Sequence, residues 1–445
     1  MILRAFVTAV AFALPSLVAG LAPGLALADI AIKEVKSPGG LTAWLVEDHN
    51  IPFTALEIRF RGGTSLDDPA KRGAINLMAG LIEEGAGELD SKGFAEARDG
   101  LAASYSFAAS SDSVSVSARF LTENRDQAVD LLALALNKPR FDEDAVARVR
   151  EQVLSGLRSD ERNPTSIASR VFDGLAYGDH PYAYSGRGSL DSVAALTRDD
   201  VVAAWKAALA RDRVYISAAG DITSEELGLV IDRILGGLPE SGAPLPQTAP
   251  WLLTPGVSVV DFPSPQSVVV FGQSGISQDD PDFFAAYILN EVMGGGRFSA
   301  RLMTEVRDRR GLTYGIGSYL VGMDHSDSYL GQFQASNDKV AEAISVIRAE
   351  WAKIAAEGIS EKELTDAKTY LTGAYPLRFD GNAPIASLLV GMQMQGMAID
   401  YPNSRNARVE AVTMADVKRV AARLYQPEAL RFVVVGRPEG VDATP

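Results

Sequence analysis

Hydrophobic and polar residues alternate along two stretches in the first half of the chain. One covers residues 54–60, and its apolar side chains are Leu56, Ile58 and Phe60. The other covers residues 113–120, and its apolar side chains are Val114, Val116, Ala118 and Phe120. Because a period of two places successive side chains on opposite faces of an extended chain, both stretches predict β-strands with one buried face.

Apolar positions spaced three or four residues apart predict helices elsewhere. Residues 142–160 carry one such stripe, formed by Val146, Val149, Val153 and Leu157. A helix is also expected over residues 72–84, where it would bury Ile75, Met78, Leu81 and Ile82. Two further helices are expected to start at a capping side chain, the first at Thr197 or Asp199 and the second at Thr413.

The two halves of the chain share motifs in the same order. The pattern G-x-S-x-D-D-P occurs at residues 63–69 and again at 275–281, an offset of 212 residues. Residues 193–201 match 409–417, and each segment precedes an apolar stretch that ends in glycine. Several matches at a nearly constant offset indicate a duplication. Since strands and helices are mixed without strict alternation, we expect an α+β fold with two related lobes, each an antiparallel-rich mixed sheet flanked by helices.

A proline-rich segment separates the two halves. Five prolines lie between Leu238 and Val257, and proline fixes φ and lacks an N–H, so this segment is expected to be neither a helix nor a central strand. The predicted organisation is a leader at 1–28, a first lobe at 29–238, a linker at 239–257 and a second lobe at 258–440.

The first residues resemble a signal peptide. Arg4 precedes an apolar run, and Ala26-Leu27-Ala28 forms a small-x-small cleavage site before Asp29. A membrane anchor is the alternative, but Pro15, Pro23 and Gly24 interrupt the apolar region. We therefore expect cleavage after Ala28 and a soluble, periplasmic mature protein without a membrane span.

Composition excludes several kinds of chemistry. The formal net charge of −15 disfavours a nucleic-acid partner, and the absence of cysteine excludes thiol catalysis and cysteine-bound metals. Only three histidines occur, His49, His180 and His325, and no pair has the i, i+4 spacing of a helical zinc site. We expect all three to be structural.

Longer motifs carry a family resemblance. Residues 177–182 read Y-G-D-H-P-Y, residues 294–302 read G-G-G-R-F-S-A-R-L, and residues 305–314 read E-V-R-D-R-R-G-L-T-Y. Together with the repeated G-x-S-x-D-D-P segment, they resemble the pitrilysin/insulinase (M16) metallopeptidases, particularly bacterial members and the mitochondrial processing peptidase. The resemblance covers essentially the whole mature chain. It implies two similar lobes per chain and a pairing of chains around a peptide chamber.

Active members of that family bind zinc through H-x-x-E-H on one helix and a glutamate from a later helix. In this sequence the matching positions are Asn76, Ala79, Gly80 and Gly156. Alanine and glycine offer no ligand atom, and an asparagine amide is a poor zinc ligand. We therefore expect no zinc in this chain. A relocated carboxylate site at Glu83-Glu84 is the alternative, and a solvated helix end is the simpler interpretation.

The second half keeps another family feature. Related enzymes use an arginine and a tyrosine seven residues apart to hold substrate and stabilise the reacting carbonyl, and Arg307 and Tyr314 have that spacing. We expect Arg307 near the end of a helix that Gly311 terminates, and Tyr314 on the following strand. A purely structural role for this pair is the alternative, and Arg309 and Arg310 compete with Arg307.

Gly294, Gly295 and Gly296 resemble the glycine-rich loop that lines the chamber and contacts substrate in such proteins. Glycines let backbone approach a peptide closely. A plain turn between helices remains an alternative, while a phosphate-binding loop is disfavoured because no Gly-Lys-Ser/Thr follows.

These features predict a non-catalytic subunit, inactive alone, of a heterodimeric zinc peptidase. Its partner would be an M16 paralogue that carries H-x-x-E-H and the zinc, and a peptide would be the substrate. The alternative function is a catalytically inert envelope scaffold or peptide-binding protein.

Overall fold

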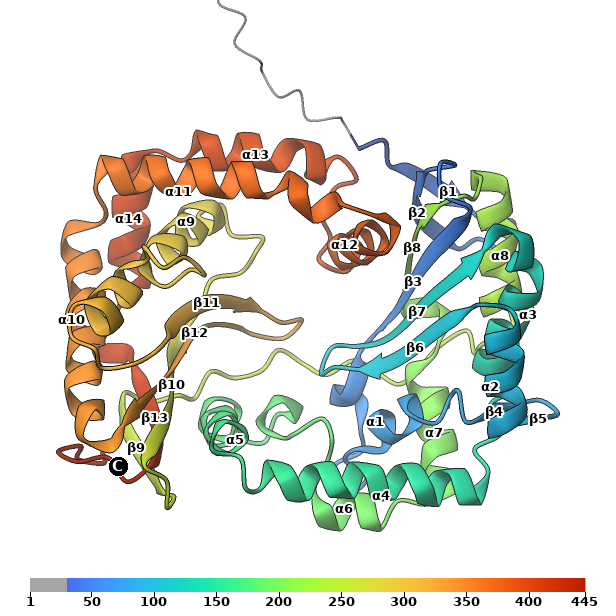
Figure 1. Cartoon of the computed structure of the whole chain (residues 1–445), viewed down its shortest axis with the longest axis horizontal. Coiled ribbons are helices and arrows are strands. Elements are labelled where there is room, and N and C mark those ends of the chain that lie inside the picture. The colour runs from blue at the N-terminus through green and yellow to red at the C-terminus, as the bar shows by residue number, and fades with distance from the viewer. Residues whose placement is uncertain (1–29, 445) are drawn as a thin grey trace, which may run out of the picture.

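The computed structural model describes residues 30–444 and shows two lobes side by side, each built on one large sheet (Figure 1). The predicted leader, with its cleavage site after Ala28, lies outside the described residues. Within residues 30–444, every helix is too short or too polar to traverse a lipid bilayer.

The first lobe contains a six-stranded sheet in the order β1-β2-β8-β3-β7-β6. Its strands are β1 (Lys33–Lys36), β2 (Thr42–Glu47), β3 (Phe53–Arg61), β6 (Ser104–Ala109), β7 (Ser113–Leu121) and β8 (Val214–Gly220). A short ribbon of β4 (Gly85–Ala86) and β5 (Leu89–Asp90) is separate. The two strands predicted from alternation are therefore confirmed as β3 and β7, which pair antiparallel with Ile58 opposite Val116.

The second lobe contains a five-stranded sheet in the order β11-β12-β10-β13-β9. Its strands are β9 (Gly256–Asp261), β10 (Gln266–Ser274), β11 (Ile316–Gly322), β12 (Asp327–Ser336) and β13 (Arg431–Gly436).

The two sheets share one topology, which confirms two related lobes. In the first sheet β8 lies between β2, which it pairs in parallel, and β3, which it pairs antiparallel. In the second sheet β13 has the same relation to β9 and β10. The repeated motif precedes a helix in each lobe. The repeated apolar stretches are β8 and β13, which end at Gly220 and Gly436.

Helices cover both sheets (Figure 1). Those from the first half of the chain are α1 (Ala74–Ala79), α2 (Ser91–Gly100), α3 (Arg125–Asn137), α4 (Glu143–Asp160), α5 (Pro164–Tyr177), α6 (Leu190–Ala194), α7 (Arg198–Ala208) and α8 (Ser224–Leu235). Those from the second half are α9 (Phe283–Met293), α10 (Val340–Glu357), α11 (Glu361–Ala374), α12 (Asn382–Met394), α13 (Tyr401–Ala411) and α14 (Met414–Leu424).

Two helix starts were predicted from their caps, and both are confirmed. The Thr197 hydroxyl accepts the N–H of Asp200 at the start of α7, and the Asp200 carboxylate accepts the N–H of Thr197. Thr413 and Asp416 form the same reciprocal capping box at α14. Thr197 is thus the cap, rather than Asp199.

The helix predicted over residues 72–84 is shorter than expected. Helix α1 spans only Ala74–Ala79, and Gly80 ends it. Beyond Gly80 the chain makes tight turns, in which the Glu84 N–H donates to the Leu81 carbonyl at 3.1 Å. Glycine is a poor helix former, which explains the early end. Four apolar side chains are nevertheless buried as predicted, at Ile75, Met78, Leu81 and Ile82.

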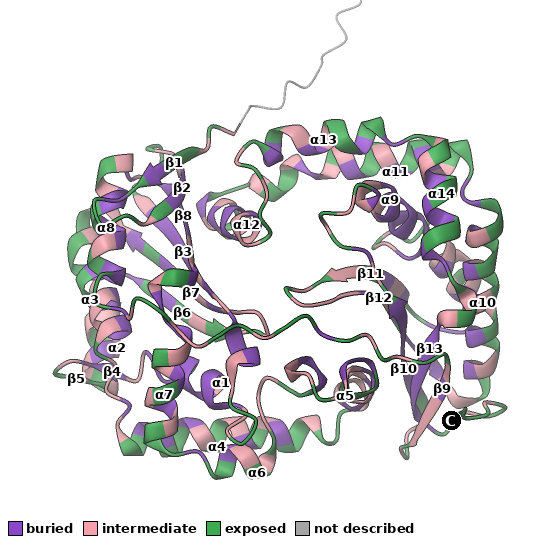
Figure 2. Cartoon of the chain, turned by 180° about the vertical axis from the view of Figure 1, so that it is seen from behind, coloured by how far each residue is buried: buried purple, intermediate pink, exposed green. Residues whose placement is uncertain are grey.

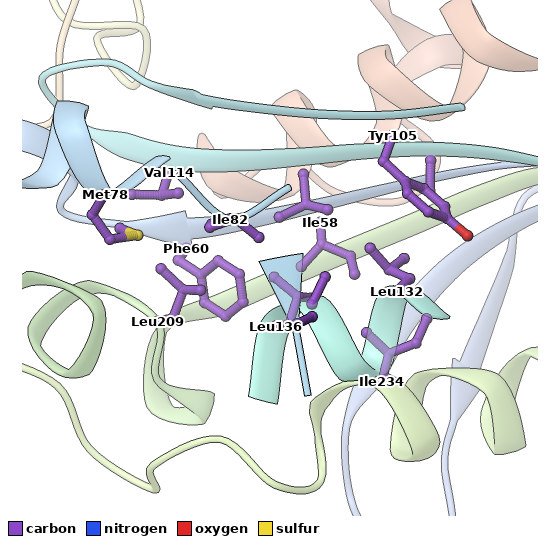
Figure 3. Packing of buried hydrophobic residues seen from close by; sticks show 14 of the residues in the cluster. Ile58, Phe60, Met78, Ile82, Tyr105, Val114, Leu132, Leu136, Leu209 and Ile234 are labelled. Carbon is purple, nitrogen blue, oxygen red and sulfur yellow. The ribbon is translucent and has the colours of Figure 1, made fainter. Parts of the chain in front are cut away.

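The first-lobe core lies between its sheet and its outer helices (Figure 3). Phe60 from β3 packs with Leu136 from α3 and Leu209, and all three are fully buried. The hydroxyl of Tyr105 satisfies its hydrogen-bonding capacity by donating to the Ala128 carbonyl at 2.6 Å. This core fixes the sheet on which α1 rests.

Each half of the chain also contributes a helix to the other lobe. Helix α5 packs on β10 and β13 of the second sheet, whereas α12 packs on β8 and β3 of the first (Figures 1 and 2). The Ser217 hydroxyl of β8 donates to the Ala386 carbonyl at 2.5 Å, and Gln393 Nε2 donates to the Ile216 carbonyl at 2.7 Å. The two lobes are therefore interlocked.

The proline-rich segment contains no helix and no strand from residue 236 to 255, as the structure describes it. Strand β9 begins at Gly256, one residue before the predicted end of the linker, because Val257 already pairs with Phe432 of β13. The linker is held in place, since the Leu252 N–H donates to the Ala176 carbonyl at 2.8 Å and Trp251 packs edge-on against Phe172.

Candidate functional site

Three of the four positions that match the zinc ligands and catalytic glutamate of active M16 members lie at α1. Ala79 is buried, Asn76 is half-buried, and Gly80 is the exposed residue that ends the helix. A Cβ atom added at Gly80 would lie 3.3 Å from Cγ1 of Val149 in α4. This end of α1 therefore packs against α4, the helix that carries the fourth position.

The start of α1 is fixed by the half-buried carboxyl of Asp67. Asp67, from the repeated motif, accepts the N–H of Gly73 at 2.7 Å and the N–H of Ile75 at 2.9 Å. Burial raises the pKa of Asp67 to about 6. The motif thus has a structural explanation, because its aspartate satisfies backbone donors that a helix start leaves free.

The fourth position, Gly156, lies in α4 beside a guanidinium group. A Cβ atom at this position would overlap Nη2 of Arg187. Arg187 is held there by Asp160, whose Oδ2 lies 2.7 Å from Nη1 of the guanidinium. A fixed cation therefore occupies the space into which a side chain at position 156 would extend.

No cluster of three or more potential metal ligands exists among residues 30–444. The Glu83-Glu84 alternative does not supply one either. Glu83 pairs with Arg98 at 3.0 Å, and Glu84 pairs with Arg148 and accepts a hydrogen bond from Ser91. Both carboxylates are thus engaged by arginine, as at an ordinary solvated surface.

The glycine-rich loop follows α9 in the second lobe, and its three glycines differ in environment. Gly294 is buried, its carbonyl accepts the N–H of Ser318 at 2.9 Å, and a Cβ there would overlap the Ser318 hydroxyl. A Cβ at Gly295 would overlap Glu291, whereas one at Gly296 meets nothing within 4 Å. The loop's first glycine is therefore required for packing, and only Gly296 is open.

Both ends of this loop are tied to α9. The Asn290 carbonyl accepts the N–H groups of Gly294 and Gly295, each at 2.9 Å. At the other end, Arg297 Nε donates to the buried Glu291 at 2.7 Å. Burial raises the pKa of Glu291, and the guanidinium partly offsets that effect. The loop is thus held in one shape.

Arg307 and Tyr314 are brought together, as the spacing predicts. Arg307 Nε donates to the Tyr314 carbonyl at 3.1 Å, and Nη1 pairs with Asp308 at 2.6 Å. The Tyr314 side chain is 90% exposed, and within the described chain its hydroxyl has no hydrogen-bond partner. Arg309 and Arg310 instead pair with Glu305 at 2.6 and 2.7 Å. Of the three candidates, therefore, only Arg307 contacts Tyr314.

Arg307 lies in a π-helical turn, Met303–Asp308. Such wide turns are rare and occur frequently at functional sites. Gly311, with φ of +61°, ends the turn and donates its N–H to the Arg307 carbonyl at 2.8 Å. The predicted termination by Gly311 is confirmed.

Tyr314 does not lie on the following strand, which corrects the prediction. Strand β11 begins at Ile316, where pairing with Phe333 starts. The Thr313 hydroxyl donates to the Gln334 carbonyl at 2.6 Å and accepts the Gly315 N–H at 3.1 Å. This turn keeps the backbone before Ile316 from pairing with β12, and the Tyr314 side chain projects into solvent.

The structure also brings together groups that the sequence could not relate. The rings of His180 and His325 lie 6.0 Å apart and flank Tyr182, whose hydroxyl donates to Asp112. Because Asp112 also accepts the N–H of Asp324 at 3.2 Å, this cluster joins the two lobes. His180 and His325 therefore lie at the contact between the lobes, and their proximity has no signal in the sequence.

A pocket of about 600 Å³ beside α4 and α5 was likewise not predicted. Its wall includes Arg72, Asp160, Asp173 and Tyr184. Burial raises the pKa of Asp173 to about 7, and no residue in 30–444 forms a hydrogen bond or ion pair with its carboxyl group. The sequence around Asp173 in α5 gives no sign that its carboxyl group lies in a pocket.

Comparisons with known proteins agree with this geometry. Residues 43–185 match the family model described as insulinase (peptidase family M16), and residues 195–371 match the model described as peptidase M16 inactive domain. A crystal structure of a peptidase M16 inactive domain from Pseudomonas fluorescens superposes with a TM-score of 0.86 at 28% identity, covering 93% of this chain and 99% of that one.

Two sequence relatives are informative. A Helicobacter pylori protein named non-peptidase homolog YmxG is 26% identical over 395 residues, covering 87% of this chain and 90% of the relative. A probable mitochondrial-processing peptidase subunit beta from Schizosaccharomyces pombe is 26% identical over 339 residues and covers 71% of each chain.

Fold and site together define a metallopeptidase-type molecule whose zinc-ligand positions have been replaced. The chain belongs to the insulinase (M16) peptidase family, as an inactive member without a zinc-ligand set of its own. The predicted fold class is confirmed by these matches.

Proposed function

We propose that this chain is the zinc-free subunit of a heterodimeric M16 peptidase, exported to the periplasm by residues 1–28. An M16 paralogue with H-x-x-E-H would hold the zinc. This chain would supply part of the chamber wall, the glycine-rich loop, and Arg307 and Tyr314. The proposal also places signal-peptide cleavage after Ala28.

An asymmetry between the two lobes carries this proposal. In the first lobe all four zinc-site positions hold Asn, Ala or Gly, and a guanidinium fills the space beside Gly156. In the second lobe Arg307 still contacts the backbone of Tyr314, whose side chain stays exposed. The exposed side chain of Tyr314 is therefore free to meet a group outside this chain, as the proposal requires.

The chemistry of the pair suits peptide hydrolysis in a partner's zinc site. When bound in the partner, zinc activates a water molecule for attack on the peptide carbonyl. The Tyr314 hydroxyl can donate a hydrogen bond to the oxygen on which negative charge develops. Arg307 holds the Tyr314 backbone through Nε, and its remaining N–H groups can donate to a substrate carbonyl.

The test is a peptidase assay on unstructured peptides, with this chain alone, with the H-x-x-E-H paralogue alone, and with both mixed. Cleavage that appears only in the mixture, and disappears with a zinc chelator, is expected. Stoichiometric zinc in this purified chain, or full activity of the paralogue alone, would contradict the proposal.

A second candidate is an inert scaffold or peptide-binding protein. The Helicobacter relative, named a non-peptidase homolog, favours it. A stable complex with the paralogue that cleaves no peptide would support this candidate over the first.

A further inference from the structure

Two hairpin tips meet where the lobes touch. One is the turn between β6 and β7 of the first lobe, which carries Asp112, and the other is the turn between β11 and β12 of the second lobe, which carries Asp324 and His325 (Figure 1). The Asp112 carboxylate accepts the N–H of Asp324 at 3.2 Å. Because β6 and β11 are the end strands of their sheets, this contact links the edges of both sheets.

Tyr182 ties the two tips to a third segment. It lies in the short 3-10 turn Pro181–Ala183 that follows α5, and its buried ring packs edge-on against Tyr177, with 5.5 Å between the ring centroids. The Tyr182 hydroxyl donates to the Asp112 carboxylate and accepts the N–H of His325 at 3.2 Å. One buried side chain therefore contacts both hairpin tips.

His180 holds this turn through both of its ring nitrogens. Nδ1 accepts the backbone N–H of Tyr182 at 3.2 Å, so His180 is the N-cap of the turn. Nε2 lies 3.1 Å from the Gln247 carbonyl of the linker. Because a carbonyl oxygen can only accept a hydrogen bond, Nε2 carries the proton and the imidazole is neutral. A second proton, on Nδ1, would face the Tyr182 N–H and remove the cap. We call this cluster the lobe junction: Asp112, His180, Tyr182, Asp324 and His325.

The surroundings of His180 disfavour a positive charge on its ring. The ring of His325 lies 6.0 Å away on the second-lobe tip, so protonation of both imidazoles would place two like charges side by side. Partial burial and His325 hold the pKa of His180 below its usual value of 6.5, although the Gln247 carbonyl and the Asp112 carboxylate act in the opposite direction.

The carboxylates nearby are engaged by other groups. Arg61 of β3 lies 3.1 Å from the Asp324 carboxylate, and Asp112 already accepts two hydrogen bonds. Burial raises the pKa of Asp324, and Arg61 partly offsets that effect. Asp179 precedes His180 but is exposed to solvent. Within residues 30–444, therefore, no carboxylate forms an ion pair with the His180 ring.

From this geometry we infer that His180 is a pH-sensitive switch at the lobe junction. While the imidazole is neutral, the cap holds Tyr182 against both hairpin tips. When the imidazole takes up a proton, the cap is lost, and the turn that carries Tyr182 releases the β11–β12 tip from the β6–β7 tip. The lobes stay joined through α5 and α12, so the change is local to the junction. The switch operates in the isolated chain and is independent of the proposed peptidase.

Acid should therefore loosen the junction. Since the closed junction favours the neutral imidazole, its stability is complete above pH 6.5 and falls as the pH drops below that value. Hydrogen–deuterium exchange of residues 323–327 measures the opening, with each rate divided by that of an unstructured peptide of the same sequence at the same pH. We expect this relative rate to be ~5-fold or more higher at pH 5 than at pH 8, which corresponds to the loss of a cap.

Two histidine variants locate the titrating group. His180→Asn keeps a cap acceptor, because the asparagine Oδ1 can take the place of Nδ1, but its side chain does not titrate. Its relative exchange rate is expected to be equally low at pH 5 and pH 8. His49→Gln is the matched control and should keep the full response. His49 pairs with Asp221, which contacts Thr122 at the opposite end of β7 from Asp112.

A pH response that persists in folded His180→Asn would overturn the inference and assign the titration to Asp112, Asp324 or His325. Equal relative rates at pH 5 and pH 8 in the unmodified chain would overturn it as well. Circular dichroism verifies that the variants are folded. His180→Gln, which places an amide near the position of Nε2, replaces the asparagine variant if that variant does not fold. None of these results alters the outcome expected of the peptidase assay.

Discussion

Arg307 Nε donates a hydrogen bond to the backbone carbonyl of Tyr314 at 3.1 Å. The spacing of seven residues is explained by this contact, because Gly311 reverses the chain after the π-helical turn and returns Tyr314 to the guanidinium. Arg307 therefore positions the segment that carries Tyr314, whatever else it contacts.

Arg307→Lys should loosen this segment while keeping its positive charge, because lysine has no Nε donor in that position. Hydrogen–deuterium exchange of residues 312–316 is expected to become faster than in the unmodified chain. Arg309→Lys is the control, since the Arg309 side chain pairs with Glu305 rather than with the Tyr314 segment. Equal exchange in the two variants would show that the contact does not order the loop.

The glycines of the loop should differ in their tolerance of a side chain. Gly294→Ala is expected to lower the free energy of unfolding by ~1–3 kcal/mol, since its Cβ would overlap Ser318 in a packed interior. Gly296→Ala, where the space is open, should change it by less than ~0.5 kcal/mol. Denaturant titration of the two variants measures both values, and a similar loss in each would contradict the packing.

Cleaving the linker should not separate the lobes. Helices α5 and α12 each pack on the other lobe's sheet, and Ser217 and Gln393 form hydrogen bonds across the interface. A protease site placed between Ser241 and Leu245 should therefore yield two fragments on a denaturing gel but one species, of unchanged size, in gel filtration. Separation into two species would show that the exchanged helices do not hold the lobes together.

Stability should depend on pH through Asp173. Burial raises the pKa of this carboxyl from 3.8 to about 7, so the folded state favours its protonated form. Its stabilising contribution is complete below about pH 4 and is lost as the pH rises towards 7, at about 1.4 kcal/mol per pKa unit. The difference in unfolding free energy between the unmodified chain and Asp173→Asn should therefore fall by a few kcal/mol across that range.

Asp179→Asn, on the exposed side of the same region, provides the comparison for this titration. Denaturant unfolding between pH 4 and 8 measures all three proteins. If the difference in unfolding free energy between the unmodified chain and Asp173→Asn stays constant with pH, burial does not raise the pKa of Asp173.

Much of the fold could be predicted from the sequence, because periodicity and capping are local. The alternation at 54–60 and 113–120 identifies β3 and β7, and Thr197 and Thr413 mark helix starts. The duplicated motifs predict the shared topology. The predicted length of α1 was wrong because Gly80 ends the helix, although the apolar residues beyond it are still buried.

Features that depend on contacts between distant residues could not be predicted. Nothing in the sequence relates α5 to β10, or His180 to His325. Tyr314 was predicted to lie on the strand after Gly311, but the hydrogen bonds of Thr313 delay the strand to Ile316.

The most direct measurement of the central claim is the turnover number of the mixed peptidase with Tyr314→Phe, which removes one hydroxyl from a fully exposed side chain. Tyr319→Phe is the matched control, because Tyr319 is a partly exposed tyrosine on β11. The account predicts that Tyr314→Phe lowers kcat ~100-fold, while assembly with the paralogue and the activity of Tyr319→Phe stay unchanged. A mixture that keeps full activity with Tyr314→Phe would contradict the account, because the Tyr314 hydroxyl would then take no part in the reaction.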